Sequence, residues 1–137
     1  MKATDPSQPR ERALLVQVVL GRRDRREAED SLAELERLAD SAGAATIGCI
    51  TQRRDRPTPG LFVGEGKLVD IQLACREGKA NVVIFDNELS AVQVNNLDLA
   101  LGIKVIDRTE VILQIFARRA RSAEAKVQVE LAQLQYL

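Results

Sequence analysis

A short glycine-rich turn, Phe62-Val63-Gly64-Glu65-Gly66-Lys67, holds the residues most suited to binding an anion. Glycines at the start of a helix let backbone N–H groups approach a phosphate, and Lys67 could pair with its charge. The GxxxxGK[ST] spacing of a P-loop is absent, and no Ser or Thr follows Lys67. The favoured interpretation is a tight strand-to-helix turn whose backbone angles need glycine. A nucleotide or phosphate site at Gly64, Gly66 and Lys67 is the alternative.

Three carboxylates, those of Asp86, Glu88 and Asp107, follow predicted strands and could form an acidic site for Mg²⁺. Helix capping accounts for the same residues without a metal. Asp107 stands three residues before Glu110 at a predicted helix start, and Asp86 and Glu88 precede a cap at Ser90. We therefore predict caps here and no metal site.

The residue types present exclude several classes of enzyme. The 137 residues include no His, so a Ser-His-Asp triad or a Cys-His pair cannot be assembled. Cys49 and Cys75 lack a CxxC spacing and are predicted to be small buried residues in a reducing cytosol. No apolar run approaches the about 18 residues of a membrane span, and no signal-peptide pattern opens the chain. We expect a cytoplasmic protein with no membrane span and no catalytic residues.

Basic residues cluster locally, although 20 Lys and Arg balance 20 Asp and Glu over the whole chain. Arg118, Arg119, Arg121 and Lys126 lie within just over two turns of a predicted helix. They form either a solvated helix face paired with nearby glutamates or a patch that contacts phosphates. Further charge of mixed sign follows the first two predicted strands, at Arg22, Arg23, Asp24, Arg53, Arg54, Asp55 and Arg56.

The elements that must position these residues alternate between strands and helices. Such alternation predicts an α/β fold with a small parallel sheet of four strands, flanking helices and right-handed crossovers. In such a sheet the loops after the strands gather at one edge, where ligands usually bind. The predicted strands are Ala13–Leu20, Ala44–Gln52, Val82–Phe85 and Ile103–Ile106. Helical patterns cover Ala28–Ala42 after a cap at Asp24, Lys67–Glu77 closed by Gly78, and Ser90–Leu101 closed by Gly102.

The last segment, from Thr109 to Leu137, contains neither Gly nor Pro and predicts one long helix of about 42 Å. Its first half could cover the sheet through Ile112, Ile115 and Phe116. Its second half carries an apolar stripe without a partner in this chain, which implies a missing helix or another molecule. The stripe continues through Val127, Leu131 and Leu134.

One stretch is more specific than any of these patterns. It begins with Val105-Ile106-Asp107-Arg108-Thr109, continues through Ile112-Leu113-Gln114-Ile115-Phe116-Ala117-Arg118-Arg119 and extends to Leu134. This stretch resembles the N-terminal region of the HflX family of translation-associated GTPases. Three upstream motifs resemble the same family at matching spacing: Gln52-Arg53-Arg54 with Pro57 and Pro59, Gly64-Glu65-Gly66-Lys67, and Phe85-Asp86-Asn87-Glu88-Leu89-Ser90.

Residues 1–11 are polar, contain Pro6 and Pro9 and show no periodicity, so they predict a flexible tail. The resemblance implies that the chain is a fragment, with an α/β domain at 12–108 and the first helix of a helical hairpin at 109–137. A GTPase domain would follow, with GTP and Mg²⁺ as its cofactors, whereas no cofactor is expected in these residues. The implied partners are the large ribosomal subunit and its RNA, and the implied role is splitting or rescuing ribosomes under stress. Arg118, Arg119, Arg121 and Lys126 become the candidate RNA contacts.

Two other functions stay open. One is an ATP-binding module with weak ATPase activity at Gly64, Gly66 and Lys67. The other is a protein-interaction domain that forms a homodimer through Val127, Leu131 and Leu134.

Overall fold

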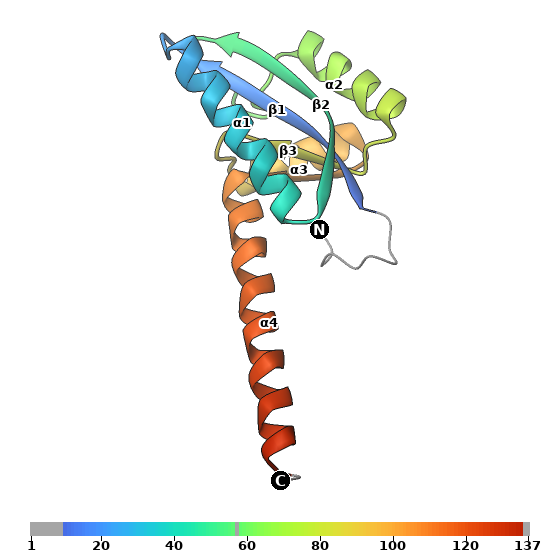
Figure 1. Cartoon of the computed structure of the whole chain (residues 1–137). Coiled ribbons are helices and arrows are strands. Elements are labelled where there is room, and N and C mark those ends of the chain that lie inside the picture. The colour runs from blue at the N-terminus through green and yellow to red at the C-terminus, as the bar shows by residue number, and fades with distance from the viewer. Residues whose placement is uncertain (1–9, 57, 136–137) are drawn as a thin grey trace.

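The computed structural model describes residues 10–56 and 58–135, so most of the predicted tail and the last two residues of the predicted long helix lie outside it. Four parallel strands form one sheet in the order β2-β1-β3-β4 (Figure 1). The α/β prediction is therefore confirmed. The strands are β1 (Glu11–Leu20), β2 (Ala44–Arg54), β3 (Val82–Phe85) and β4 (Lys104–Asp107), and the helices are α1 (Arg25–Ser41), α2 (Glu65–Gly78), α3 (Ala91–Leu101) and α4 (Arg108–Gln135).

Helices cover both faces of the sheet, and β1 supplies alternate residues to two separate cores. Leu14, Val16 and Val18 pack with α2 and α3, whereas Ala13 and Leu15 pack with α1 and α4. This division follows from the period of two along a strand. Because both sides of β1 are buried, its sequence reads as an almost continuous apolar run.

Local capping chemistry fixes the helix ends that the sequence predicted. Asp24 caps α1 by accepting a hydrogen bond from the Arg26 amide, and Ser90 forms a reciprocal capping box with Gln93. Gly102 ends α3 in the left-handed conformation. These residues satisfy backbone groups that have no partner inside the helix.

Several predicted boundaries differ from the observed ones, and the end of β2 moves for a tertiary reason. Strand β2 continues through Arg54 because these last residues pair with the end of β1, Arg54 lying opposite Leu20. Helix α2 ends with Lys79 in the left-handed conformation, whereas Gly78 is its last helical residue. Glycine is needed at 78 because the Ile47 side chain occupies the place where a Cβ would lie. At the other end of the sequence, β1 begins at Glu11, at the end of the predicted tail.

Two predicted core residues are exposed. Cys75 is buried, as predicted, but Cys49 lies exposed on the edge strand β2. Phe116 was expected to cover the sheet, yet it is 60% exposed, and Val111 and Ile115 are the buried residues of α4. The reason is rotational, because the face of α4 that meets the domain lies about 150° around the helix from the apolar stripe.

Helix α4 follows the end of β4 and runs back past the opposite edge of the sheet (Figure 1). Every residue from 119 to 135 is exposed. At 1.5 Å per residue, this segment extends about 25 Å beyond the domain. We call residues 119–135 the arm. Within the described ranges, no helix is long and apolar enough to cross a membrane.

Candidate functional site

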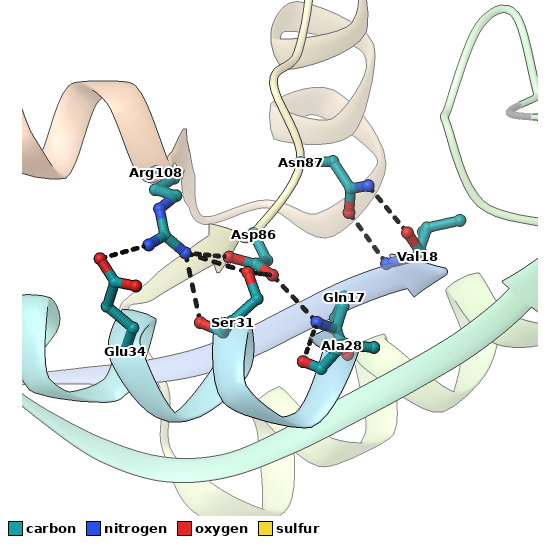
Figure 2. A network of polar contacts seen from close by, with 8 residues as sticks. All are labelled: Gln17, Val18, Ala28, Ser31, Glu34, Asp86, Asn87 and Arg108. Atoms are coloured by element: carbon teal, nitrogen blue, oxygen red, sulfur yellow. Dashed lines mark hydrogen bonds and ion pairs between the residues drawn. The ribbon is translucent and has the colours of Figure 1, made fainter. Parts of the chain in front are cut away.

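The carboxyl end of β3 holds a network of polar side chains that joins three elements (Figure 2). The Asp86 side chain is only 2% exposed, and its Oδ1 lies 2.8 Å from the Arg108 guanidinium at the start of α4. Its Oδ2 accepts hydrogen bonds from Gln17 Nε2 at 2.9 Å and from Ser31 Oγ at 2.7 Å. Arg108 also forms an ion pair with Glu34 of α1 at 2.8 Å. The network thus fastens α1 and the long helix to the centre of the sheet.

The acidic neighbours of Arg108 favour its charged form. Burial by itself would lower the pKa of Arg108, but hydrogen bonds and charge from Asp86 and Glu34 outweigh it and raise that pKa. A guanidinium is charged at any physiological pH. Arg108 therefore acts as a fixed positioning group, and the arrangement is structural in its chemistry.

The sheet order reverses between β1 and β3, and this is where open α/β sheets commonly bind ligands. Here the chain's own side chains fill that place. Asn87 accepts a hydrogen bond from the Val18 amide at 2.9 Å and donates one to the Val18 carbonyl at 2.8 Å, as a paired strand would (Figure 2). Beside it, Gln17 bridges Asp86 and the Ala28 carbonyl.

The predicted acidic site separates into different roles. Asp107 is a cap, as predicted, because it accepts hydrogen bonds from the amides of Glu110 and Leu89, each at 3.0 Å. The capping interpretation of Asp86 is wrong, since its carboxylate is the buried partner of Arg108. Glu88 is exposed. Among the described residues, no group of three or more acidic or Cys side chains is placed to hold a metal ion.

The glycine-rich turn has its two glycines for different reasons. Gly64 adopts φ −74° and ψ 159°, which any residue can adopt, so the backbone-angle explanation is wrong there. Glycine at this position leaves room for the Arg54 guanidinium, which lies where a Cβ would be and would have to move aside for a larger residue. The Gly64 amide donates to Gln52 Oε1 at 3.2 Å. Gly66 has open space around it, and Lys67 lies 3.6 Å from Asp70 in an ion pair.

The four predicted RNA-contacting cations do not form one patch. Arg118 donates a 2.6 Å hydrogen bond to the carbonyl of Ser41 at the end of α1, so it binds the helix to the domain. Arg119, Arg121 and Lys126 are exposed on the arm. At 100° per residue, Arg119 and Lys126 share one side of α4, and Arg121 lies on the other side of the apolar stripe.

The apolar stripe is exposed along its whole length. The exposed fractions are 60% for Phe116, 53% for Val127, 55% for Leu131 and 64% for Leu134. Because Leu113 and Phe116 belong to the same face, the stripe begins beside the α/β domain and continues through the arm. Exposed apolar surfaces of this kind are typical of places where a protein contacts another helix or protein.

Sequence inspection missed the pairing of Asp86 with Arg108. The two residues are 22 positions apart, and only the parallel pairing of β3 with β4 brings their strand ends together. The one available signal was that both residues directly follow apolar strands, which places them on the same sheet edge.

The fold and sequence match proteins of one kind. A family model described as "GTP-binding GTPase N-terminal" matches residues 29–117. The chain is 48% identical over 127 residues to the GTPase HflX of Alkalihalophilus pseudofirmus, covering 93% of this chain and 30% of that protein. It is 50% identical over 108 residues to the GTPase HflX of Escherichia coli, covering 79% of this chain and 25% of that protein.

Solved structures agree with these matches. A GTP-binding protein from Sulfolobus solfataricus, crystallised in complex with GDP, aligns with a TM-score of 0.58 and 25% identity, covering 92% of this chain and 36% of that one. The chain spans less than a third of the length of the curated relatives named above.

Removing the Arg108 side chain is expected to destabilise the fold strongly. Arg108→Ala leaves the buried Asp86 carboxylate without its cation, and urea unfolding should show a loss of about 3–5 kcal/mol. The matched control, Arg119→Ala in the exposed arm, should change stability by less than about 0.5 kcal/mol. The double variant Asp86→Asn, Arg108→Gln should recover part of the loss, because it leaves no buried charge. If Arg108→Ala and Arg119→Ala were equally stable, the role assigned to the pair of Asp86 and Arg108 would be wrong.

The two glycines of the turn are expected to respond to alanine with opposite signs. Gly66→Ala should stabilise the chain by about 0.5 kcal/mol, because alanine favours the helix and meets open space. Gly64→Ala should destabilise it by about 1 kcal/mol, because alanine is a poor N-cap and displaces Arg54. Thermal unfolding measures both. Saturable ATP binding by calorimetry that both Gly66→Ala and Lys67→Ala abolish would show instead that the turn is a nucleotide site.

Proposed function

The chain belongs to the GTP-binding GTPase N-terminal family, and on that premise we propose that it is the ribosome-binding and regulatory domain of an HflX-type GTPase. The whole protein would hydrolyse GTP with Mg²⁺ in a domain that follows these residues. This chain contains no GxxxxGK[ST] motif, so it would bind and position and would perform no chemistry itself. It would act in the cytoplasm on the large ribosomal subunit, in splitting or rescuing ribosomes under stress.

The observation that carries this proposal is the arm. A helix that leaves its domain exposes cations on two sides, Arg119 and Lys126 on one and Arg121 on the other. Ribosomal RNA is a dense array of phosphates, and guanidinium and ammonium groups bind phosphate through charge and hydrogen bonds. The arm is narrow enough to enter a crevice in folded RNA, since a helix with its side chains is about 10–12 Å wide.

Arg118 has a different part in this proposal. Its bond to the Ser41 carbonyl lies where α4 leaves α1, so Arg118 would hold the angle of the arm. A contribution of Arg118 to RNA binding would then act mainly through the position of the other three cations.

Replacing the arm cations is expected to weaken ribosome binding. The triple variant Arg119→Ala, Arg121→Ala, Lys126→Ala should lower the affinity for purified large ribosomal subunits at least about tenfold and flatten the salt dependence. The matched control removes three exposed cations elsewhere, with Arg37, Arg76 and Lys104 each changed to Ala, and should bind nearly as the parent chain does. Cosedimentation at several salt concentrations measures both, and equal loss in the two variants would contradict a specific role for the arm.

The apolar stripe supports a second part of the proposal. We infer that a second helix of the same protein packs against Val127, Leu131 and Leu134, completing a helical hairpin next to the GTPase domain. An apolar seam along one face of a helix is the usual surface for antiparallel helix packing. Among the described residues no helix packs against the stripe. A homodimer through the same residues is the contact that two copies of this chain could form instead.

The isolated chain is accordingly expected to self-associate. Light scattering should show a mass that rises with concentration toward a dimer, because two stripes bury each other's apolar surface. Leu131→Glu should shift the chain to a monomer. Val129→Glu is the matched control, since Val129 is 58% exposed but lies on the opposite side of α4. A strictly monomeric mass for the parent chain at high concentration would count against the stripe as a contact surface.

A further inference from the structure

Strand β2 leaves a long edge of the sheet open. It is an outer strand, and within residues 10–56 and 58–135 no strand lies on its outer side (Figure 1). Such an edge presents unpaired N–H and C=O groups, and proteins usually protect it with charged residues, proline or a short strand. Strand β2 has 11 residues, contains no proline and carries charge only at its last two positions, Arg53 and Arg54. Its edge can therefore pair with another chain.

The other outer strand, β4, has a protected edge. It has only four residues, and the Asp98 side chain accepts a hydrogen bond from the Val105 amide at 2.7 Å. At the start of β2, the Arg10 guanidinium similarly donates to the Ala44 carbonyl at 2.9 Å. Among the described residues, no side chain bonds to the backbone of residues 48–54. The open part of the edge is thus the carboxyl half of β2.

Alternation along β2 identifies the backbone groups that face outward. The Gly21 amide donates to the Arg54 carbonyl at 2.9 Å, so the peptide groups of Arg54 face β1. Successive residues of a strand direct these groups to opposite sides, and residues 48–54 pair with 14–20 without a register shift. The N–H and C=O groups that face the open edge therefore belong to Cys49, Thr51 and Arg53.

An apolar hollow of about 340 Å³ lies between this part of β2 and helix α1. Its lining includes the buried Val19 and Ala28, the half-buried Leu32, and the exposed Thr51 and Arg53. A strand added to β2 would lie about 4.8 Å away, and its residue opposite Thr51 would direct its side chain to the same face of the sheet. An apolar side chain at that position would reach the hollow.

Charge at the end of β2 determines the sign of the partner. Residues 53–56 are Arg53, Arg54, Asp55 and Arg56, and β2 itself has no acidic residue. A carboxylate opposite Arg53 forms a favourable cross-strand pair, whereas a cation there is repelled. A nucleic acid would satisfy this charge, but it has no strand edge to pair with Cys49 and Thr51 and no apolar side chain for the hollow. The surface therefore fits a peptide better than a nucleic acid.

We propose that the open edge of β2 binds an extended acidic segment of another protein by β-strand addition. Backbone hydrogen bonds supply affinity in this mode of recognition, and alternate side chains supply specificity. The segment runs antiparallel to β2, the slightly more stable pairing. It places an aspartate or glutamate opposite Arg53 and an apolar side chain opposite Thr51. This contact belongs to the α/β domain and goes beyond the function proposed for the arm.

A synthetic peptide tests the proposal. Fluorescein-labelled Thr-Asp-Thr-Leu-Thr-Val-Thr carries a leucine for the hollow and, two residues earlier, an aspartate for Arg53. Fluorescence anisotropy should show saturable binding to the chain. Replacing the peptide's leucine by alanine should weaken binding at least about tenfold, because less apolar surface enters the hollow. Replacing its aspartate by lysine should also weaken binding, because two cations then face each other.

A substitution in β2 separates strand addition from attraction by charge. Thr51→Pro removes an N–H that faces the open edge and leaves the pairing with β1 intact, as prolines on edge strands do. It should weaken peptide binding at least about tenfold, since a backbone hydrogen bond is lost and the proline ring obstructs the added strand. Thr51→Val is the matched control, because it keeps the N–H and nearly the same shape, and it should bind as the parent chain does. Thermal unfolding verifies that both variants fold.

Amide hydrogen exchange gives a second readout. The peptide should slow exchange at Thr51 and Arg53, whose N–H groups face the open edge, and leave the arm unchanged. Absence of saturable binding, or equal binding by Thr51→Pro and Thr51→Val, overturns the proposal. A loss of RNA-hairpin binding in Thr51→Pro without a loss of peptide binding would also overturn it. The arm variant Arg119→Ala, Arg121→Ala, Lys126→Ala should bind the peptide normally, so failure here leaves the proposed function intact.

Discussion

The carboxylate of Asp86 is almost completely removed from water, and the elements around it are arranged to satisfy it. A buried unpaired charge is among the most destabilising features a fold can contain, so the partners of Asp86 must be in place whenever the chain is folded. Those partners come from β1, α1 and the first residue of α4. This one carboxylate thereby links the packing of the α/β domain to the direction of the long helix.

The sequence was sufficient for most of the architecture because local signals and the final structure agree. The apolar run Val82–Phe85 is the strand β3, and the Ser90 cap and Gly102 terminator bracket α3 where they were predicted. In these segments the cap, the hydrophobic period and the turn residue all point the same way. A chain folds to one structure, and its structure can be predicted from its sequence, when such local signals agree with the final fold.

The candidate site was less readable because its contacts depend on rotation and register. A stripe at helical spacing reveals an apolar face, but it does not say which face meets the domain, and Phe116 was assigned to the wrong one. In the same way, the sequence around Arg118 predicts an RNA contact, whereas in the structure its guanidinium donates a hydrogen bond to the Ser41 carbonyl. The charges that follow β1 and β2 and their common sheet edge could be predicted from the sequence, whereas the register that places Arg54 opposite Leu20 required the structure.

Over the part of the chain that the structure describes, the domain holds helix α4 as far as Arg118, and residues 119–135 project from it without support. For a free length of about 25 Å, a tilt of 10° at the support moves the tip by about 4 Å, which is more than the length of a hydrogen bond. The more rigidly the domain holds the start of α4, the more precisely the end of the arm is positioned. The ion pairs of Arg108 and the hydrogen bond from Arg118 to the Ser41 carbonyl fix the direction of α4. A small change in these contacts would therefore produce a large displacement at the far end of the helix.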